Sequence, residues 1–216
     1  MSIVTFIIPT IGRTSLNDAL NSLYKQTIQD WKAIVIFDGL SPNITINDER
    51  VSILTCEKLG TKEMINGIEK ANGAGRVRNF GIQHCNTEWV AFLDDDDTLA
   101  HTYLETLYNE IHLCFNVDAV IFRMYHPEYG VLPKVESTHF QKYEVGISFA
   151  IKKKVFDQGI CFVSGHDEDY VFLCNVYDNN YKICMSPYVK YFVNNANHAE
   201  MFPKKGRRMI LNSNKQ

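Results

Sequence analysis

Short runs of apolar residues recur along the chain and predict its strands. These runs occupy residues 3–8, 33–37, 51–54, 89–93 and 119–124. Each is four to six residues long with almost no polar interruption, a pattern typical of strands that are buried on both faces. Such strands belong to sheets whose two faces are both covered. We therefore expect a central sheet with helices on either side.

Amphipathic stretches lie between these runs and predict the helices. Apolar residues recur at helical spacing from Ser15 to Tyr24, from His101 to Phe115 and from Asp167 to Asn179. The stretch from Glu63 to Cys85 also shows helical spacing, and its glycines predict that it divides into two helical pieces. Alternation of strands and helices through residue 124 indicates an α/β domain with a mostly parallel sheet.

The pattern changes after residue 124. Residues 125–150 are rich in proline and glycine, and we expect loops there with an added strand near Val145–Ile151. Residues 182–193 return to extended structure, and from residue 194 the apolar pattern fades into a polar and basic stretch. A chain of 216 residues can bury one substantial hydrophobic core. We therefore predict a single domain over 1–216, with halves at 1–124 and 125–193 and a flexible tail at 194–216.

The run at 89–93 ends in four consecutive carboxylates, Asp94 to Asp97. Ligands of parallel sheets bind at the carboxyl ends of the strands, where these acids are expected. Adjacent negative charges repel one another, so a divalent cation is the simplest compensation. Side chains alternate along an extended segment, so Asp94 and Asp96 can face one ligand while Asp95 and Asp97 turn away. A solvated turn in which Asp97 or Thr98 caps the next helix is the alternative.

Composition indicates which partners, which state of the cysteines and which location to expect. A formal net charge of −3 provides no basic field, so we expect no nucleic-acid partner. The six cysteines contain no CxxC pair, which favours reduced and mostly buried thiols. The N-terminus lacks the features of a secretory leader, and no apolar stretch approaches the ~20 residues of a membrane span. We therefore expect a soluble, cytoplasmic protein with no transmembrane segment.

Several motifs, taken in order, give the first hundred residues a family likeness. They are Ile7-Ile8-Pro9-Thr10, Gln26-Thr27, Ile36-Phe37-Asp38-Gly39, Arg78-Asn79-x-Gly81 and Phe92-Leu93 followed by the four aspartates. In this order and spacing the chain resembles family 2 glycosyltransferases, and the likeness extends more weakly to about residue 180. The resemblance implies the GT-A fold, an α/β nucleotide-binding fold. It also implies transfer of a sugar from a nucleoside diphosphate donor with inversion at the anomeric carbon.

The resemblance assigns donor-binding roles to individual residues. Residues 1–124 become the nucleotide-sugar half, and Mn²⁺ or Mg²⁺ becomes the cofactor. Asp38 favours a uridine donor because a carboxylate can accept the imide N–H of uracil, although Asp38-Gly39 also fits a simple turn after a strand. Arg76 is a weaker candidate than Arg78. The implied nucleotide-binding residues are Pro9, Thr10, Arg13, Asp38, Arg78, Asp94 and Asp95, and the implied metal ligands are Asp96, Asp94 and His198.

The resemblance also implies how the acceptor is activated. Inverting transfer needs a base to take the proton from the acceptor hydroxyl, and Asp169 matches the family's base, with Glu168 in support. Acids at this position also suit the N-terminus of a helix, so capping is the competing explanation. Residues 125–193 become the acceptor-binding half, for a carbohydrate or glycoconjugate. The basic residues Lys204 to Arg208 are candidates for a diphosphate clamp, with a solvated basic end as the alternative.

Two other functions fit part of the pattern. Residues 90–98 also match the motif of haloacid-dehalogenase-like phosphatases, in which Asp94 is the nucleophile and Asp96 the acid and base. That class places the motif on the first core strand, whereas here about 90 residues precede it. A noncatalytic GT-A-like module that binds a nucleotide sugar is the second alternative. It predicts that Asp169 faces away from the donor acids.

Overall fold

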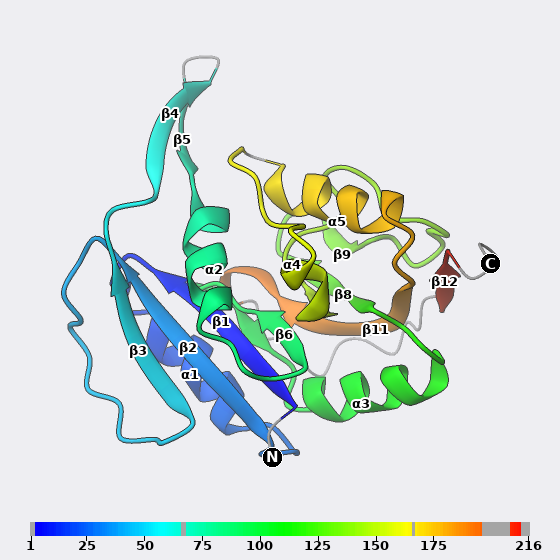
Figure 1. The fold of residues 1–216 in the computed structure, drawn as a ribbon, viewed down its shortest axis with the longest axis horizontal. Helices are drawn as coiled ribbons and strands as arrows, with labels where there is room; N and C mark the ends of the chain where they lie inside the picture. Colours follow the sequence, from blue (N-terminus) through cyan, green and yellow to red (C-terminus); the bar gives the residue numbers. More distant parts are fainter. Residues whose placement is uncertain (1–2, 66–67, 166, 196–207, 213–216) are drawn as a thin grey trace.

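The computed structural model describes residues 3–65, 68–165, 167–195 and 208–212. One twisted sheet forms its centre, with strands in the order β3-β2-β1-β6-β10-β8-β11-β12 (Figure 1). Four neighbouring strands from the first half run parallel, as the sequence predicts. They are β1 (Val4–Thr10), β2 (Trp31–Asp38), β3 (Val51–Cys56) and β6 (Trp89–Phe92).

The second half continues the same sheet with mixed directions. β10 pairs antiparallel with both β6 and β8, whereas β11 runs parallel to β8. The short strands β7 and β12 pair with β11, and β9 pairs with β8. The bounds are β7 (Thr98–Leu99), β8 (Ala119–His126), β9 (Gly130–Leu132), β10 (Phe149–Lys152), β11 (Ile183–Phe192) and β12 (Met209–Leu211). The α/β prediction is confirmed, and the two halves share one sheet.

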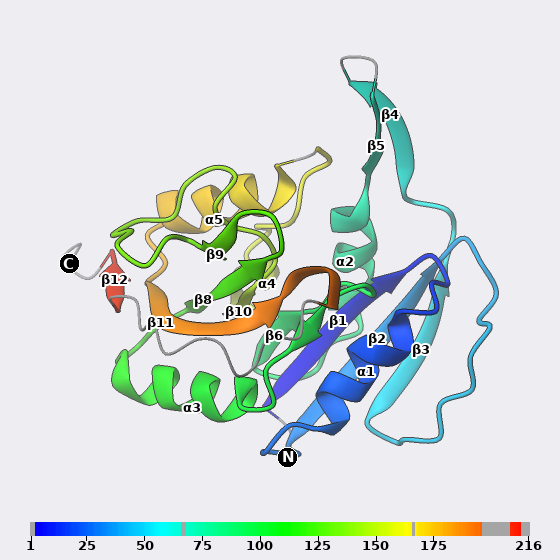
Figure 2. The ribbon, with the colours of Figure 1, turned by 180° about the vertical axis from the view of Figure 1, so that it is seen from behind.

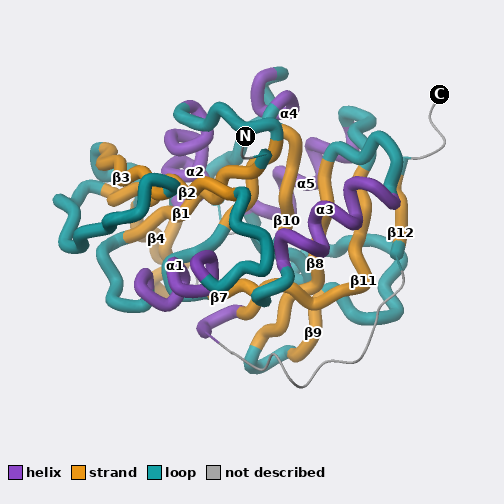
Figure 3. The backbone as a smooth tube through the Cα atoms, turned by 90° about the horizontal axis from the view of Figure 1, so that it is seen from below, coloured by secondary structure: helices purple, strands orange, loops and turns teal. Residues whose placement is uncertain are grey.

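Helices cover both faces of this sheet. α1 lies behind β1 and β2 in Figure 1 and in front of them in Figure 2, while α2 takes the opposite side. Figure 3 shows the strands between helices when the molecule is seen from below. The predicted helices near 15–24, 101–115 and 167–179 are confirmed. The observed bounds are α1 (Leu16–Tyr24), α2 (Ala74–Gln83), α3 (Tyr103–Leu113), α4 (Lys154–Asp157), α5 (Glu168–Asp178) and the 3₁₀ turn η1 (Val193–Asn195).

The prediction of two helical pieces between Glu63 and Cys85 is half wrong. Only α2 is helical, and the preceding stretch forms a hairpin of β4 (Thr61–Ile65) and β5 (Ile68–Asn72) with Ile65 opposite Ile68. The hairpin projects from the body of the molecule in Figures 1 and 2. The sequence does carry a signal for it, because Asn66-Gly67 is typical of two-residue hairpin loops.

Close packing of α2 on the sheet depends on Gly81. A Cβ at this position would lie 2.7 Å from Ile36 Cδ1 and 3.1 Å from Ile7 Cγ2. Without one, α2 rests directly on β1 and β2, whose apolar side chains are almost all buried. The motif Arg78-Asn79-x-Gly81 therefore includes one residue that sets the distance between helix and sheet. This distance determines how far the side chains of Arg78 and Asn79 reach.

The predicted tail, 194–216, is only partly described. Within it, Met209–Leu211 forms β12, antiparallel to Ile183–Met185 of β11, so these three residues belong to the sheet. Leu211 is buried there, which explains the pairing: it is one of the few apolar side chains in a polar stretch. Among the described residues, no helix is both long enough and apolar enough to span a bilayer.

Candidate functional site

The four aspartates follow β6 in a tight loop at the carboxyl ends of the parallel strands. The amide of Asp97 donates to the carbonyl oxygen of Asp94 at 3.1 Å, which closes the turn. Asp95 and Asp97 are buried. The side chains of Asp94 and Asp96 are 33% and 38% exposed. The alternation is the one expected for an extended segment, and it leaves Asp94 and Asp96 open to a ligand.

Asp95 is fixed by the neighbouring end of β1. The hydroxyl of Thr10 donates to Asp95 Oδ2 at 2.6 Å, and Arg13 Nη1 donates to Asp95 Oδ1 at 2.6 Å. Arg13 also reaches Asp96 Oδ2 at 3.1 Å, and its side chain remains 47% exposed. Pro9 lies within β1 opposite Ile36 and is buried. Thr10 and Arg13 therefore hold the loop in place, and Arg13 keeps a face toward solvent.

Asp97 connects the loop to the end of β11. Its carboxylate accepts hydrogen bonds from the amide of Asn194, at 2.7 Å, and from the hydroxyl of Tyr191. Burial, with the nearby charge of Asp94, raises the pKa of Asp97 to about 8. Tyr191 could not be singled out from the sequence, because a tyrosine in a buried strand looks like any other core residue. Its hydroxyl accepts a hydrogen bond from the amide of Asp94 at 3.1 Å.

Arg78 is buried and joins three acids from two distant segments. Its Nη2 donates to Asp94 Oδ1 at 2.7 Å, and its Nη1 donates to Glu168 Oε1 at 2.5 Å. Asp169 Oδ1 lies 3.5 Å from the same Nη1. Opposite charges at these distances offset the cost of burial, and the pKa of Arg78 stays raised. One guanidinium thus holds the loop after β6 beside the start of α5.

Two further contacts fix α2 against the segment before α5. Asn79 donates to the carbonyl oxygen of Phe162 at 2.8 Å and accepts a hydrogen bond from the amide of Phe162 at 3.1 Å. The amide of Gly75 donates to Glu168 Oε2 at 3.0 Å. A Cβ at Gly75 would lie 2.7 Å from that oxygen, so only glycine allows this approach. Glu168 is therefore bound at both oxygens within the protein.

Asp169 has fewer contacts than Glu168. Asp169 Oδ1 is buried, and within the described part of the chain it has the Arg78 ion pair but no hydrogen-bond donor. Burial raises the pKa of Asp169 to about 7, and the positive charge of Arg78 partly opposes this. The side chain as a whole is 23% exposed. A basic oxygen with this pKa can accept a proton near neutral pH.

Asp38 ends β2 and is held by the chain that follows β3. Its Oδ1 accepts a hydrogen bond from the amide of Leu59 at 2.6 Å, and its Oδ2 accepts one from the amide of Gly60 at 3.0 Å. Lys58 Nζ also reaches Oδ2 at 2.9 Å, from a side chain that is 58% exposed. Binding of a uracil N–H therefore requires exchange of an internal contact, and the exposed Lys58 is the contact most easily released.

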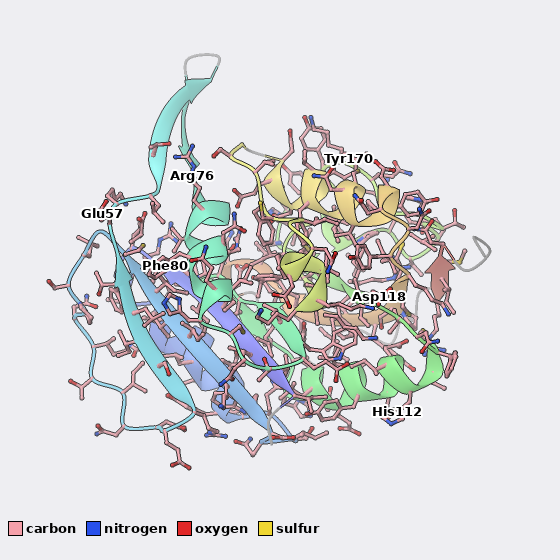
Figure 4. The ribbon with its side chains drawn as sticks, viewed as in Figure 1. Glu57, Arg76, Phe80, His112, Asp118 and Tyr170 are labelled. Atoms are coloured by element: carbon pink, nitrogen blue, oxygen red, sulfur yellow. The ribbon has the colours of Figure 1, made fainter. Side chains whose placement is uncertain are left out.

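Of the remaining predicted residues, Arg76 and Arg208 are described by the structure and the others are not. Arg76 is exposed on α2 near the base of the hairpin, where it donates to Ser164 Oγ at 2.6 Å (Figure 4). Arg208 pairs with Glu110, on α3, with Nε 2.7 Å from Oε2. His198 and Lys204, Lys205 and Arg207 lie outside the described residues. Their contacts with metal or diphosphate remain predictions from the sequence.

The exposed acids suit a divalent cation. Asp94 and Asp96 offer carboxylate oxygens, the ligands that Mn²⁺ and Mg²⁺ prefer. Burial raises the pKa of Asp96, and the charges of Asp94 and Asp95 raise it further, so a cation would favour its charged form. Within the described residues, only one group of three side chains brings potential metal-binding atoms within 4.8 Å of one another, and its members are Glu110, Cys114 and Cys184. A cation at Asp94 and Asp96 therefore needs further oxygens from a ligand such as a diphosphate.

Known proteins are similar to this chain in sequence. A family model described as glycosyl transferase family 2 matches residues 5–168. A relative from Escherichia coli, the UDP-Glc:alpha-D-GlcNAc-diphosphoundecaprenol beta-1,3-glucosyltransferase WfgD, is 28% identical over 109 residues. That match covers 48% of this chain and 38% of WfgD. The chain spans 14% to 38% of the length of three such relatives.

Solved structures share the fold. TarS of S. aureus superposes with a TM-score of 0.71 at 18% identity, covering 92% of this chain and 38% of TarS. TarS 1–349 in complex with UDP-GlcNAc gives a TM-score of 0.64 at 18% identity and covers 94% of this chain and 61% of that one. The mannosyltransferase PcManGT from Pyrobaculum calidifontis, in complex with GDP-Man and Mn2+, gives 0.62 at 18% identity, with 91% and 58% covered. The GT-A fold predicted from the sequence is confirmed.

Proposed function

Because the chain belongs to glycosyl transferase family 2, we propose that it transfers a sugar from a nucleoside diphosphate donor to an acceptor hydroxyl, with inversion at the anomeric carbon. One observation carries the proposal. Arg78 binds Asp94, at the donor acids, and Glu168 and Asp169, at the start of α5, with the same guanidinium. A proposed donor-binding acid and a candidate base thus lie on either side of one buried charge, which brings the base close to the donor acids.

The donor in this proposal is a uridine diphosphate sugar. Asp38, Thr10 and Arg13 lie at the carboxyl ends of neighbouring parallel strands, where a nucleotide is expected. The name of the relative WfgD includes UDP-Glc, and TarS is solved with UDP-GlcNAc. In this proposal Arg13, which Asp95 holds in place, lies beside the diphosphate. The exposed guanidinium of Arg13 is available to a phosphate oxygen.

Asp96 and Asp94 would hold Mn²⁺ or Mg²⁺ together with donor oxygens. When bound, the cation neutralises the charge that builds on the departing diphosphate. Asp96 is the main ligand in this arrangement because its contact with the exposed Arg13 is longer, at 3.1 Å, than the 2.7 Å contact of Asp94 with the buried Arg78. PcManGT, with its bound Mn2+, supports a divalent cation at this kind of site.

Asp169 acts as the general base in this proposal. Its carboxylate, whose side chain is 23% exposed, accepts the hydrogen bond of the acceptor hydroxyl and takes its proton as the hydroxyl oxygen attacks the anomeric carbon. The bond to the diphosphate breaks on the opposite face of the sugar. Glu168, bound by Arg78 and Gly75, fixes the start of α5 and so orients Asp169.

Residues 125–193 form the acceptor side in this proposal, and a carbohydrate or glycoconjugate is the acceptor class. The start of α5 comes from this half, whereas the acids after β6 come from the first. The base and the donor site therefore approach from different halves of the chain. This division lets the acceptor vary without changes in the donor residues.

The two alternative functions fit the site less well. A phosphatase of the haloacid dehalogenase type carries its nucleophile after the first core strand, whereas these acids follow β6, with β1, β2 and β3 earlier in the same sheet. A noncatalytic module predicts that Asp169 faces away from the donor acids. Asp169 instead lies 3.5 Å from the arginine that binds Asp94.

The test is a donor screen followed by turnover. Purified protein with Mn²⁺ is mixed with UDP-, GDP-, dTDP- and CMP-sugars, and thermal shift identifies the donor; a ligand at 100 times its Kd stabilises by about 2.7 kcal/mol. Release of nucleoside diphosphate is then measured with a panel of sugar acceptors. We expect UDP-sugar turnover that requires the cation and is lost in Asp96→Ala and Asp169→Asn. Hydrolysis of simple phosphate monoesters, or no shift with any donor, would contradict the proposal.

A further inference from the structure

Two cysteines face each other in the core, away from the acid site. Cys114 follows the last residue of α3, and Cys184 lies in β11, 70 positions later in the chain. Both are buried, and their Sγ atoms lie 2.6 Å apart. Cys56 and Cys85, also buried, have side-chain contacts with oxygen atoms instead. The Cys114 and Cys184 sulfurs are therefore close enough to react with each other.

A carboxylate and an arginine surround the pair. Glu110, on α3, is fully buried and lies 3.8 Å from Cys114 Sγ and 3.6 Å from Cys184 Sγ. Arg208 donates to both oxygens of Glu110, at 2.7 and 3.0 Å, and Ser186 donates at 3.1 Å. His112, two residues further along α3, points away from the sheet (Figure 4). The Glu110 carboxylate is thus already bound by donors.

These contacts favour a covalent link over a metal centre. Two thiolates on one tetrahedral zinc lie about 3.7 Å apart, since each bond is ~2.3 Å long. The sulfurs here are closer than that. A cation at this position would also have to displace Arg208 from Glu110, or bind next to the positive charge of Arg208. Formation of a bond of ~2.05 Å requires only that the sulfurs close the remaining gap.

We propose that Cys114 and Cys184 are a redox-reactive pair that forms a disulfide between the end of α3 and β11. Nothing in the proposed sugar transfer uses either residue. The modification site is separate from the donor acids. It lies beside the Arg208–Glu110 ion pair and the pairing of β12 with β11. The oxidant that we assign to it is hydrogen peroxide, a molecule small enough to reach buried sulfur.

The chemistry takes two steps. Cys114, as the thiolate, attacks one oxygen of hydrogen peroxide, the O–O bond breaks, and sulfenic acid and hydroxide result. Cys184 then attacks the Cys114 sulfur, the S–O bond breaks, and the disulfide forms as water leaves. The two protons that the thiols gave up end on the hydroxide and on the departing oxygen. The two sulfurs lose two electrons in total and the peroxide gains them, so both of its oxygens end as water.

The hydrogen bond between the two thiols supports Cys114 as the attacking sulfur. Its pKa is lowered, chiefly by the hydrogen bond from the Cys184 thiol, and Arg208 contributes in the same direction. A thiolate, not a thiol, is the nucleophile in this reaction. A cavity of about 360 Å³ between α3 and β11 is lined in part by Glu110 and Arg208. The Glu110 carboxylate lies within 3.8 Å of both sulfurs.

The experiment measures the cross-link directly. The full chain is reduced, treated with hydrogen peroxide, alkylated and digested without reductant, and the peptides are sequenced by mass spectrometry. Tryptic peptide 183–190 carries Cys184 as its sole cysteine, so a linked species is recognised easily. We expect it joined to peptide 79–123 with a mass loss of two hydrogens, and fragment ions should place the link at Cys114 and not at Cys85. The oxidised protein should melt roughly 5 °C or more above the reduced protein.

Matched variants provide the controls. Cys114→Ser and Cys184→Ser should abolish both the cross-link and the rise in melting temperature. Cys85→Ser, at another buried cysteine, and Cys161→Ser, at an exposed one, should retain both. The wild-type mapping needs no variant, so the test survives a variant that fails to fold. Free thiols at both positions after oxidation would overturn the proposal, as would stoichiometric zinc bound by wild type and lost in Cys114→Ser.

Discussion

The hydroxyl of Tyr191 accepts a hydrogen bond from the backbone amide of Asp94 at 3.1 Å, across 97 positions of sequence. The same hydroxyl donates to the buried carboxylate of Asp97. β11 also pairs antiparallel with β7, placing Tyr191 opposite Leu99. The loop that carries the candidate metal ligands is therefore shaped by a strand from the far end of the chain.

Tyr191→Phe tests this connection. The change removes the acceptor of the Asp94 amide and one donor to the Asp97 carboxylate, so we expect a loss of about 1–3 kcal/mol in the free energy of unfolding. Donor affinity in the presence of Mn²⁺ should also fall, because the loop is less well fixed. Urea titration and calorimetry measure the two effects. Tyr143→Phe, at a side chain that is 77% exposed, is the control and should change neither. Wild-type values for Tyr191→Phe would refute the connection.

The stability of the metal-free protein should depend on the protonation of Asp97. Burial, with the charge of Asp94, raises its pKa to about 8 from an ordinary value near 3.8. A raised folded-state pKa means that the native state binds the proton more tightly than the unfolded state. This contribution to stability is complete below about pH 4 and is lost as pH rises to about 8. Urea unfolding between these values should show the decline, and Asp97→Asn should reduce it. An equal slope in both proteins would contradict the assignment.

Arg78 should be essential for both stability and transfer. Arg78→Ala leaves Asp94, Glu168 and Asp169 buried or half-buried without their shared cation, and breaking such a cluster typically costs about 3–5 kcal/mol. Lysine retains the charge but cannot hold Asp94 and Glu168 with two separate groups, so Arg78→Lys should still lose transfer. Arg76→Ala, two positions away and exposed, is the matched control for urea unfolding and for release of the nucleoside diphosphate. Equal losses in the Arg76 and Arg78 variants would show that the effect is not specific to this cluster.

Gly81→Ala tests the distance between α2 and the sheet. The new methyl group would meet Ile36 Cδ1 at 2.7 Å, and such overpacking typically costs about 1–3 kcal/mol, less the gain of ~1 from better helix propensity. Gly146→Ala is the control, since its Cβ would lie 3.4 Å from the flexible Met124. Thermal unfolding distinguishes the two. If Gly81→Ala is as stable as Gly146→Ala, the close approach of the helix is not a constraint.

The sequence predicted the parts of the molecule that local pattern and strand direction determine. Continuous apolar runs identified β1, β2 and β6, and the position of Asp94 to Asp97 after one of them indicated a ligand site at the sheet edge. Alternation along an extended segment then predicted which of the acids are exposed. The hairpin at Thr61–Asn72 escaped prediction because its short strands also fit helical spacing, which masked the turn signal between them.

Local sequence patterns do not predict contacts between residues that are far apart in the chain. The roles of Tyr191 and Gln26 depend on partners far away in sequence, and neither residue type indicates them. Gln26, part of the Gln26-Thr27 motif, donates to the carbonyl oxygen of Ala100 at 2.8 Å and accepts a hydrogen bond from the amide of Leu104 at 3.1 Å. It thereby fixes the start of α3, which follows the acid loop. The opposition of Cys114 and Cys184 likewise required the fold, since 70 positions separate them.

The pH dependence of transfer should report Asp169. Its pKa is raised to about 7 by burial, and the base must be deprotonated to accept the proton of the acceptor hydroxyl. We therefore expect kcat/KM to be level above pH 7 and to fall about tenfold per pH unit well below it. Asp169→Asn should lower kcat by about 10²–10⁴-fold while donor affinity, measured by calorimetry, changes little. Asp167→Asn, which alters a half-exposed acid paired with Lys142, is the matched control and should keep the wild-type profile. A wild-type pH profile in Asp169→Asn would assign the proton transfer to another group.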